Sequence, residues 1–162
     1  MLSIFILLEG NYEYMIIKFE VPGPAIGKQR PRFVRRGSYV STYTPQRTMN
    51  YQEKVIKAYN NISKGKKLSG SIKAEICAVY EPPKSISKKK RQDMIDGKIP
   101  YTKKPDSDNI GKSILDGLNE VAYDDDSSID ELHVYKTYGE ESKCYVKLSD
   151  DKHVVSPFIF YK

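Results

Sequence analysis

The chain has 162 residues, of which 39% are apolar, and its 27 Lys and Arg against 21 Asp and Glu give a net charge of +6. This length and composition favour one globular domain with a buried core, and they exclude a disordered tail or a fibrous repeat. The longest apolar run, residues 2–8 with Ser3 inside it, is shorter than the roughly 20 residues of a membrane helix, so no membrane partner is expected.

Residues 1–14 precede the first predicted element. They lack the basic start and the small-residue cleavage site of a signal peptide, so we interpret them as an N-terminal extension, either an added strand or a disordered start. Apolar and polar side chains alternate over residues 15–21 and meet Pro22, which predicts a strand that ends in a turn. The predicted domain covers residues 15–149 and leaves residues 150–162 as a C-terminal tail.

The next segment, residues 21–52, contains six basic residues and no acidic one. Four of the first five cations are arginines, whose planar guanidinium suits phosphate oxygens better than the lysine ammonium does. We predict that these five contact a polyanion such as the phosphate backbone of a nucleic acid: Lys28, Arg30, Arg32, Arg35 and Arg36. Tyrosines 39, 43 and 51 follow and could stack on bases, although tyrosines at this spacing are more often ordinary packing residues.

Three elements are expected between residues 45 and 97. Thr44 and Pro45 are typical of a helix start, and an apolar repeat at helical spacing then predicts a helix over residues 45–61. Strict alternation predicts a strand over residues 72–80. Ser87 is a candidate cap for a short basic helix that ends near residue 97. Its cations could contact phosphates or could equally form a solvated face: Lys88, Lys89, Lys90 and Arg91.

The sign of the charge changes after this helix, because residues 105–131 contain nine acidic residues and one lysine. Asp108 is the predicted N-cap of a helix over residues 109–119, in which Ile110, Ile114 and Leu118 form one apolar stripe. Residues 129–138 and 142–149 flank a Gly-Glu-Glu turn and predict a terminal antiparallel hairpin. Together these elements predict a single α+β domain, with helices packed on a small mixed sheet of about four strands.

Cysteine and histidine usage points away from zinc. Cys77 and Cys144 are far apart, and the two histidines are equally isolated, whereas a structural zinc site needs four ligands in paired spacing. One long-range disulfide is conceivable, but two reduced thiols in a cytoplasmic chain are the more common arrangement. We therefore expect a cytoplasmic protein.

The chemistry is expected at aspartates near the ends of the helix over residues 109–119. Asp106 and Asp108 can point to the same side if the backbone there is extended, and a helix N-terminus favours their ionised form. The acidic turn of residues 124–126 could complete the site. Ionised carboxylates that lie close together need a cation, and hard oxygen ligands suit Mg²⁺ or Mn²⁺. By itself, this pattern is more often an Asp cap followed by an acidic turn.

The stretch KKPDSDNIGKSILDGLNEVAYDDD (residues 103–126), together with residues 129–136, resembles the signature of the RusA family of Holliday junction resolvases. Three upstream motifs resemble phage and prophage members of this family: GKQRPRF at residues 27–33, YTP at 43–45 and SKKKR at 87–91. The resemblance implies a small homodimeric, Mg²⁺-dependent endonuclease, with Mn²⁺ as a substitute, that nicks four-way DNA junctions in recombination and repair. It implies no small-molecule cofactor.

Position in the family motif also implies the site residues. The resemblance makes Asp106, Asp108 and Asp126 catalytic metal ligands, with Asp125 as the other candidate for the third ligand. The motif lysine falls on Lys112, where it could balance charge on the phosphoryl group. Its alternative role is a surface ion pair with Asp108 or Asp116, worth about 0.3 to 0.5 kcal/mol.

Two other functions stay open at this point. The first is a non-catalytic dimer that binds branched DNA. The second is a less selective nuclease that acts on flaps, forks or RNA. A C2 dimer with two identical sites fits the two-fold symmetry of a junction that is cut in two opposed strands.

Overall fold

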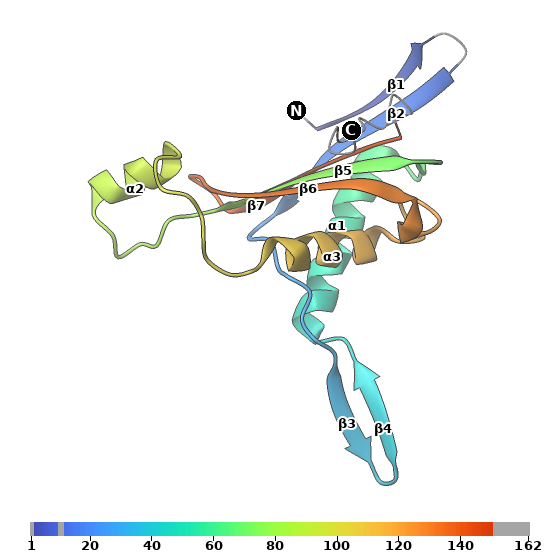
Figure 1. Cartoon of the computed structure of the whole chain (residues 1–162), viewed down its shortest axis with the longest axis horizontal. Coiled ribbons are helices and arrows are strands. Elements are labelled where there is room, and N and C mark those ends of the chain that lie inside the picture. Colours follow the sequence, from blue (N-terminus) through green and yellow to red (C-terminus); the bar gives the residue numbers. More distant parts are fainter. Residues whose placement is uncertain (1, 10–11, 151–162) are drawn as a thin grey trace, which may run out of the picture.

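Five strands form a mixed sheet in the order β1-β2-β7-β5-β6 (Figure 1). The strands are β1 (Ser3–Glu9), β2 (Tyr12–Pro22), β5 (Ile72–Tyr80), β6 (Ile129–Tyr138) and β7 (Lys143–Ser149). The computed structural model describes residues 2–9 and 12–150. It confirms the predicted α+β class and single domain, with one strand more than expected.

β5 lies between β7 and β6 in this sheet. Its side chains alternate between buried and half-buried, as the sequence predicts for a strand with one face on a core. It pairs in parallel with β6 and antiparallel with β7. The prediction that β6 and β7 form a hairpin with each other is therefore wrong. Their short connection crosses the end of β5 instead, where the Gly139 N–H donates to the Tyr80 carbonyl and the Glu81 N–H donates to the Ser142 hydroxyl.

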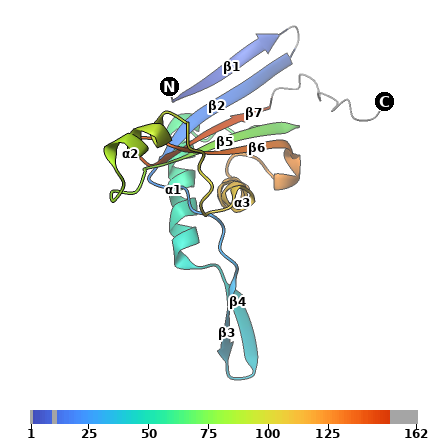
Figure 2. The same cartoon turned by 60° about the vertical axis from the view of Figure 1, so that its left-hand side comes forward.

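Helices α1 (Gln46–Ser63) and α3 (Ser107–Leu118) cover one face of the sheet (Figures 1 and 2). The apolar stripe predicted for α3 is buried there. Phe19 of β2 meets Tyr59 of α1 edge to face, with ring centroids 5.6 Å apart. A Cβ on Gly117 would lie 3.1 Å from the Cβ of Gln52, so glycine allows α3 to cross α1 closely. The two helices and one sheet face thus enclose the core.

The short helix α2 (Lys88–Ile95) lies beyond the end of β5, separate from this core (Figure 1). Ser87 caps it as predicted, because the Ser87 hydroxyl accepts a hydrogen bond from the Lys90 N–H at 3.3 Å. Only Met94 of this helix is buried. Its basic first turn is therefore presented to solvent.

An element absent from the predictions extends away from the main sheet. β3 (Arg32–Arg36) and β4 (Tyr39–Tyr43) pair as a separate antiparallel hairpin, which we call the arm (Figures 1 and 2). Gly37 makes its turn with φ of 64°, a conformation that glycine adopts without steric cost. The arm leads directly into the start of α1.

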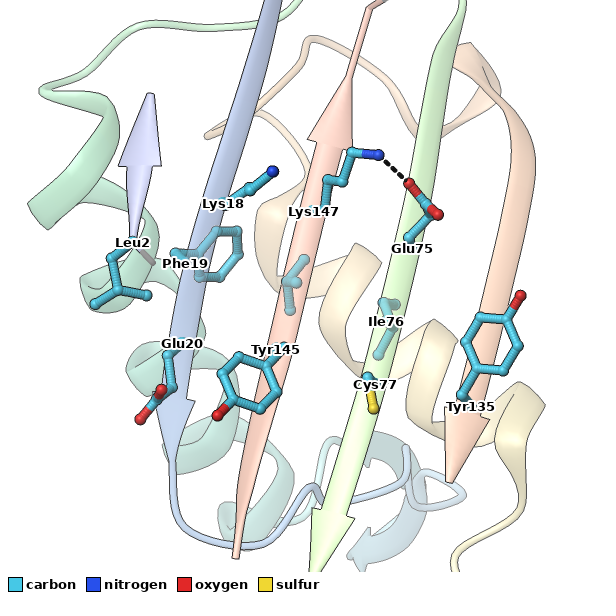
Figure 3. Close-up of a pocket in the computed structure, with 11 residues that line it drawn as sticks. Leu2, Lys18, Phe19, Glu20, Glu75, Ile76, Cys77, Tyr135, Tyr145 and Lys147 are labelled. Atoms are coloured by element: carbon cyan, nitrogen blue, oxygen red, sulfur yellow. Dashed lines mark hydrogen bonds and ion pairs between the residues drawn. The ribbon is translucent and has the colours of Figure 1, made fainter. Parts of the chain in front are cut away.

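The opposite face of the sheet carries a pocket, whose lining residues Figure 3 shows. It is lined by Lys18, Glu75, Lys147, Tyr135 and Tyr145, and Lys147 donates a hydrogen bond to Glu75. Cys77 lies on this face, whereas Cys144 is buried on the helix side. Both thiols are free, because the sheet separates them, which confirms the expectation of reduced cysteines.

The start of the chain pairs with the sheet. Residues 3–9 form β1, the added strand that was one of two expectations for the extension, and β1 pairs antiparallel with β2. The predicted tail lies outside the described residues except for Asp150, whose carboxylate accepts hydrogen bonds from the N–H groups of Met15 and Ser69. Among the described helices, none has the length and apolar character to cross a membrane.

Candidate active site

Asp106 stands at the start of α3. Its backbone is extended, and the Ile110 N–H donates to its carbonyl, so Asp106 is the N-cap and Asp108 lies in the first helical turn. The prediction that Asp108 is the N-cap is wrong, because the helix begins at Ser107, two residues before its predicted start and three before Ile110, the first residue of the apolar stripe. Within the described part of the chain, the Asp106 side chain makes no capping hydrogen bond, so the helix does not use this carboxylate.

Asp106 opens into a polar groove of about 480 Å³. One wall is the segment of residues 25–29, and the other is the loop that enters α3. The groove is also lined by three cations, Lys28, Arg47 and Lys104. A carboxylate beside several cations is an arrangement that suits a phosphate held next to a metal ion.

The two walls are fastened together at Gly27 and Lys28. The Lys28 N–H donates to the Asn109 carbonyl at 2.8 Å. A Cβ on Gly27 would lie 2.9 Å from the Cβ of Pro105 and 3.1 Å from the Cβ of Asn109. Only glycine fits between these groups without displacing them, so this residue fixes the position of the loop before Asp106.

Lys136 on β6 supports the same loop from the other side. Its ammonium donates to the carbonyls of Lys103 and Pro105, at 2.9 and 3.0 Å. It also lies 5.5 Å from the ring centroid of Tyr101, which stacks on Tyr80. The loop is therefore held to the sheet immediately before Asp106.

Two ion pairs run along the outer face of α3. The Lys112 ammonium lies 3.6 Å from the Asp108 carboxylate, and both side chains are 62% exposed. Asp116 pairs instead with Lys28, one of the predicted DNA contacts. Lys112 therefore forms the surface ion pair with Asp108 that was its alternative role. Because the side chain is exposed, it is also accessible to a phosphate.

The acidic turn follows the other end of α3. Asp124 pairs with Lys67 at 2.9 Å. The Asp125 carboxylate accepts a hydrogen bond from the Ser127 N–H at 2.9 Å and so caps a single 3₁₀ turn, Asp126–Ser128. Hydrogen bonds from the Ser127 side chain and backbone hold the pKa of Asp125 below its usual range. Because Asp125 is engaged locally, Asp126 is the better candidate for an external ligand.

A single chain does not bring the three predicted metal ligands together. Asp106 and Asp108 lie at the N-terminal end of α3, and Asp126 follows its C-terminal end (Figure 1). The 12 residues of α3 span about 18 Å. Among the described residues, no group of three or more Asp, Glu, His or Cys side chains is arranged to hold a metal ion.

The predicted DNA contacts occupy two projections beside this site. The arm and the segment leading to it carry Arg30, Arg32, Arg35 and Arg36, and α2 carries Lys88, Lys89, Lys90 and Arg91. The three lysines of α2 are exposed at its N-terminal end, where the helix dipole disfavours cations. Tyr51 is buried, so the packing alternative holds for this tyrosine.

Two comparisons relate the chain to known proteins. A family model described as endodeoxyribonuclease RusA matches residues 22–149. The chain is also 33% identical over 137 residues to the uncharacterized protein YqaN of Bacillus subtilis (strain 168), a match that covers 83% of this chain and 96% of YqaN. The chain belongs to the RusA family of endodeoxyribonucleases.

The RusA match contains every site residue discussed above and the whole arm, while β1 and most of β2 precede it. Membership confirms the resemblance found in the sequence and indicates a DNA endonuclease. Sequence reasoning found the two aspartates at the start of α3. It did not identify Gly27 or Lys136 as supports of the RusA motif, because their roles depend on contacts between segments distant in the chain.

Proposed function

We propose that this RusA-family chain is a Mg²⁺-dependent endonuclease that nicks four-way DNA junctions. The observation that carries this proposal is the position of Asp106, which lines one groove together with Lys28, Arg47 and Lys104. The basic arm and α2 extend from the same domain and supply further phosphate contacts. Phosphate contacts recognise the shape of a branched DNA without requiring a particular sequence.

The residues at the start of α3 fit a magnesium ion. Mg²⁺ is usually held by one or two carboxylates, with water and substrate phosphates in its other positions. Asp106 and Asp108 offer two carboxylates at the positive end of a helix, and the helix does not engage Asp106 as a cap. A bound Mg²⁺ would neutralise a phosphate oxygen and make hydroxide available at neutral pH.

The neighbouring cations have a separate role. Arg47 and Lys104 hold the phosphate in the groove and offset its charge, since both line the groove beside Asp106. Lys112, one turn after Asp108, is placed to balance negative charge that develops on the phosphoryl group. To do so it must leave an exposed ion pair, which is weak.

We further propose that the active form is a C2 homodimer in which each site combines two chains. The length of α3 keeps Asp126 away from Asp106 and Asp108 of its own chain. In a two-fold dimer, Asp126 of the partner subunit can approach instead. Such a dimer has two identical sites for the two opposed strands of a junction.

Cleavage of a synthetic four-way junction tests the proposed activity. Nicking should require Mg²⁺ and should be much weaker on a linear duplex. Even the removal of groups that orient metal ligands costs about 10- to 100-fold, so Asp106→Asn and Asp108→Asn should each lower nicking more than about 100-fold while binding persists. Asp124→Asn is the matched control, because its carboxylate is 93% exposed and pairs with Lys67; it should retain activity.

Other outcomes identify the alternatives. Junction binding without nicking at any Mg²⁺ or Mn²⁺ concentration would support the non-catalytic dimer, which the separation of the carboxylates within one chain favours. Equal cutting of flaps, forks and junctions would support the less selective nuclease. Full activity of Asp106→Asn would overturn the proposed site.

A further inference from the structure

The arm presents apolar side chains to solvent on a hairpin that belongs to no larger sheet. Phe33 is 75% exposed, Tyr39 81%, Val40 63% and Tyr43 46%. Isolated hairpins are marginally stable in water, and exposed apolar surface of this kind usually marks an interaction site. These side chains therefore form a surface suited to binding a partner and do not belong to the core.

Cations and apolar side chains lie side by side on both faces of the arm. Directly opposed residues of an antiparallel pair share a face, so Arg32 lies beside Tyr43 on one face and Arg35 beside Val40 on the other. Phe33 shares the second face with Arg35. Each face thus offers a ring next to a guanidinium, the combination that binds a base and its adjoining phosphate.

Charge selects nucleic acid over a second copy of this chain as the partner. Residues 21–52, which include the arm, contain no acidic residue, and the whole chain carries a net charge of +6. Two arms from different copies would bring like charges together, whereas DNA supplies a phosphate for each guanidinium.

We propose that the arm inserts at the branch point of the DNA, where Phe33 and Tyr39 stack on bases that have lost their neighbours. This inference rests on the proposed junction nuclease activity. In a continuous duplex, each base face is covered by the next base, so a ring must first separate them. At a branch point, stacking is interrupted, and the rings of the arm find uncovered base faces.

The root of the arm connects this contact to the cleavage site. Gly27 and Lys28, shortly before β3, are fastened to the loop and helix that carry Asp106. Insertion of the arm would consequently place the phosphates near the branch in the groove beside Asp106. The arm thus determines where the cut falls relative to the branch point.

Fluorescence of 2-aminopurine tests the inference without any cleavage. The base analogue is placed at the branch of a four-way junction, and at a matching position in a linear duplex, and the full chain is added in EDTA. The analogue is bright where its faces are uncovered and is quenched when a ring stacks on it, so the wild type should lower the emission severalfold in the junction only. The variant Phe33→Ala/Tyr39→Ala should lose most of this decrease and bind the junction about tenfold more weakly.

The matched control is Ser41→Ala/Thr42→Ala, which changes two exposed residues of β4 and keeps every ring and cation of the arm. It should behave as the wild type, and thermal unfolding should coincide for all three chains. The dependence of binding on salt should also be unchanged in the ring variant, because its phosphate contacts remain.

The outcomes separate this inference from the proposed function. Tight junction binding without any change in emission would overturn the insertion of the arm and leave the nuclease proposal intact. A chain that binds no junction would overturn both. If the ring variant dissociates into monomers in sedimentation experiments, the arm is a contact between subunits and the inference is wrong.

Discussion

At the scale of single residues, Lys136 supports the site without reaching it. Its ammonium donates to two carbonyls of the loop before Asp106. Lys136→Met keeps the length of the side chain and removes these donors. Because misplacement of a reacting group by about 1 Å can cost 100-fold, we expect the single-turnover nicking rate to fall about 10- to 100-fold, with little change in junction affinity.

Lys143→Met is the control for Lys136, since Lys143 on β7 pairs with the carboxylates of Glu20 and Glu141 rather than with the loop carbonyls. It should leave the nicking rate unchanged. A Lys136→Met variant that binds the junction more weakly but cuts at the wild-type rate at saturation would instead make Lys136 a phosphate contact.

The acidic turn allows a second comparison at this scale. Asp125 caps a 3₁₀ turn, while the exposed Asp126 starts it. Asp126→Asn should therefore lower nicking more than about 100-fold and raise the Mg²⁺ concentration that the residual activity needs. Asp125→Asn should retain most activity, because asparagine also caps turns. The reverse order of activities, measured in parallel Mg²⁺ titrations, would make Asp125 the ligand.

At the scale of elements, α2 offers a direct test of phosphate binding. Lys88, Lys89 and Lys90 are exposed in its first turn. Their replacement by alanine should lower the slope of log affinity against log salt by about 0.9 for each phosphate that the variant no longer neutralises. The helix should persist, since alanine favours helices and the cations oppose the dipole. An unchanged slope would show that these lysines form a solvated face of the helix and do not bind phosphate.

The packing of residues 25–29 on α3 is a second feature of this scale. Gly27→Ala places a Cβ within 2.9 Å of the Pro105 Cβ. Overpacking of this kind typically costs about 1 to 3 kcal/mol, so we expect a lower free energy of unfolding in urea together with slower nicking. Unchanged stability and activity would contradict the role of Gly27 in holding the loop.

Sequence periodicity predicted the elements that bury a regular face. The stripe of α3, the alternation of β5 and the Ser87 cap of α2 each have a local cause, and the structure confirms them. The arm was missed because its exposed strands leave no core pattern. The position of β5 between β6 and β7 was missed because pairing depends on the whole sheet, whereas the sequence shows only that β6 and β7 are close in the chain.

At the scale of the whole molecule, the candidate site was predicted in part. The spacing of Asp106 and Asp108 and the family motif identified the residues at the start of α3. The helix between them and Asp126 was predicted, but the sequence does not show that the turn after α3 stays at the far end of the helix, because this depends on how the chain packs under the sheet. A site that uses all three aspartates therefore requires two chains, as proposed above.

A mixed dimer shows whether two chains share each site. Two differently tagged chains, one carrying Asp106→Asn and the other Asp126→Asn, are coexpressed and purified through both tags. One composite site of this dimer keeps both aspartates, so it should nick one strand of a four-way junction in Mg²⁺, although each variant is inactive as a homodimer. A mixed dimer as inactive as its two parents would contradict a site shared between chains.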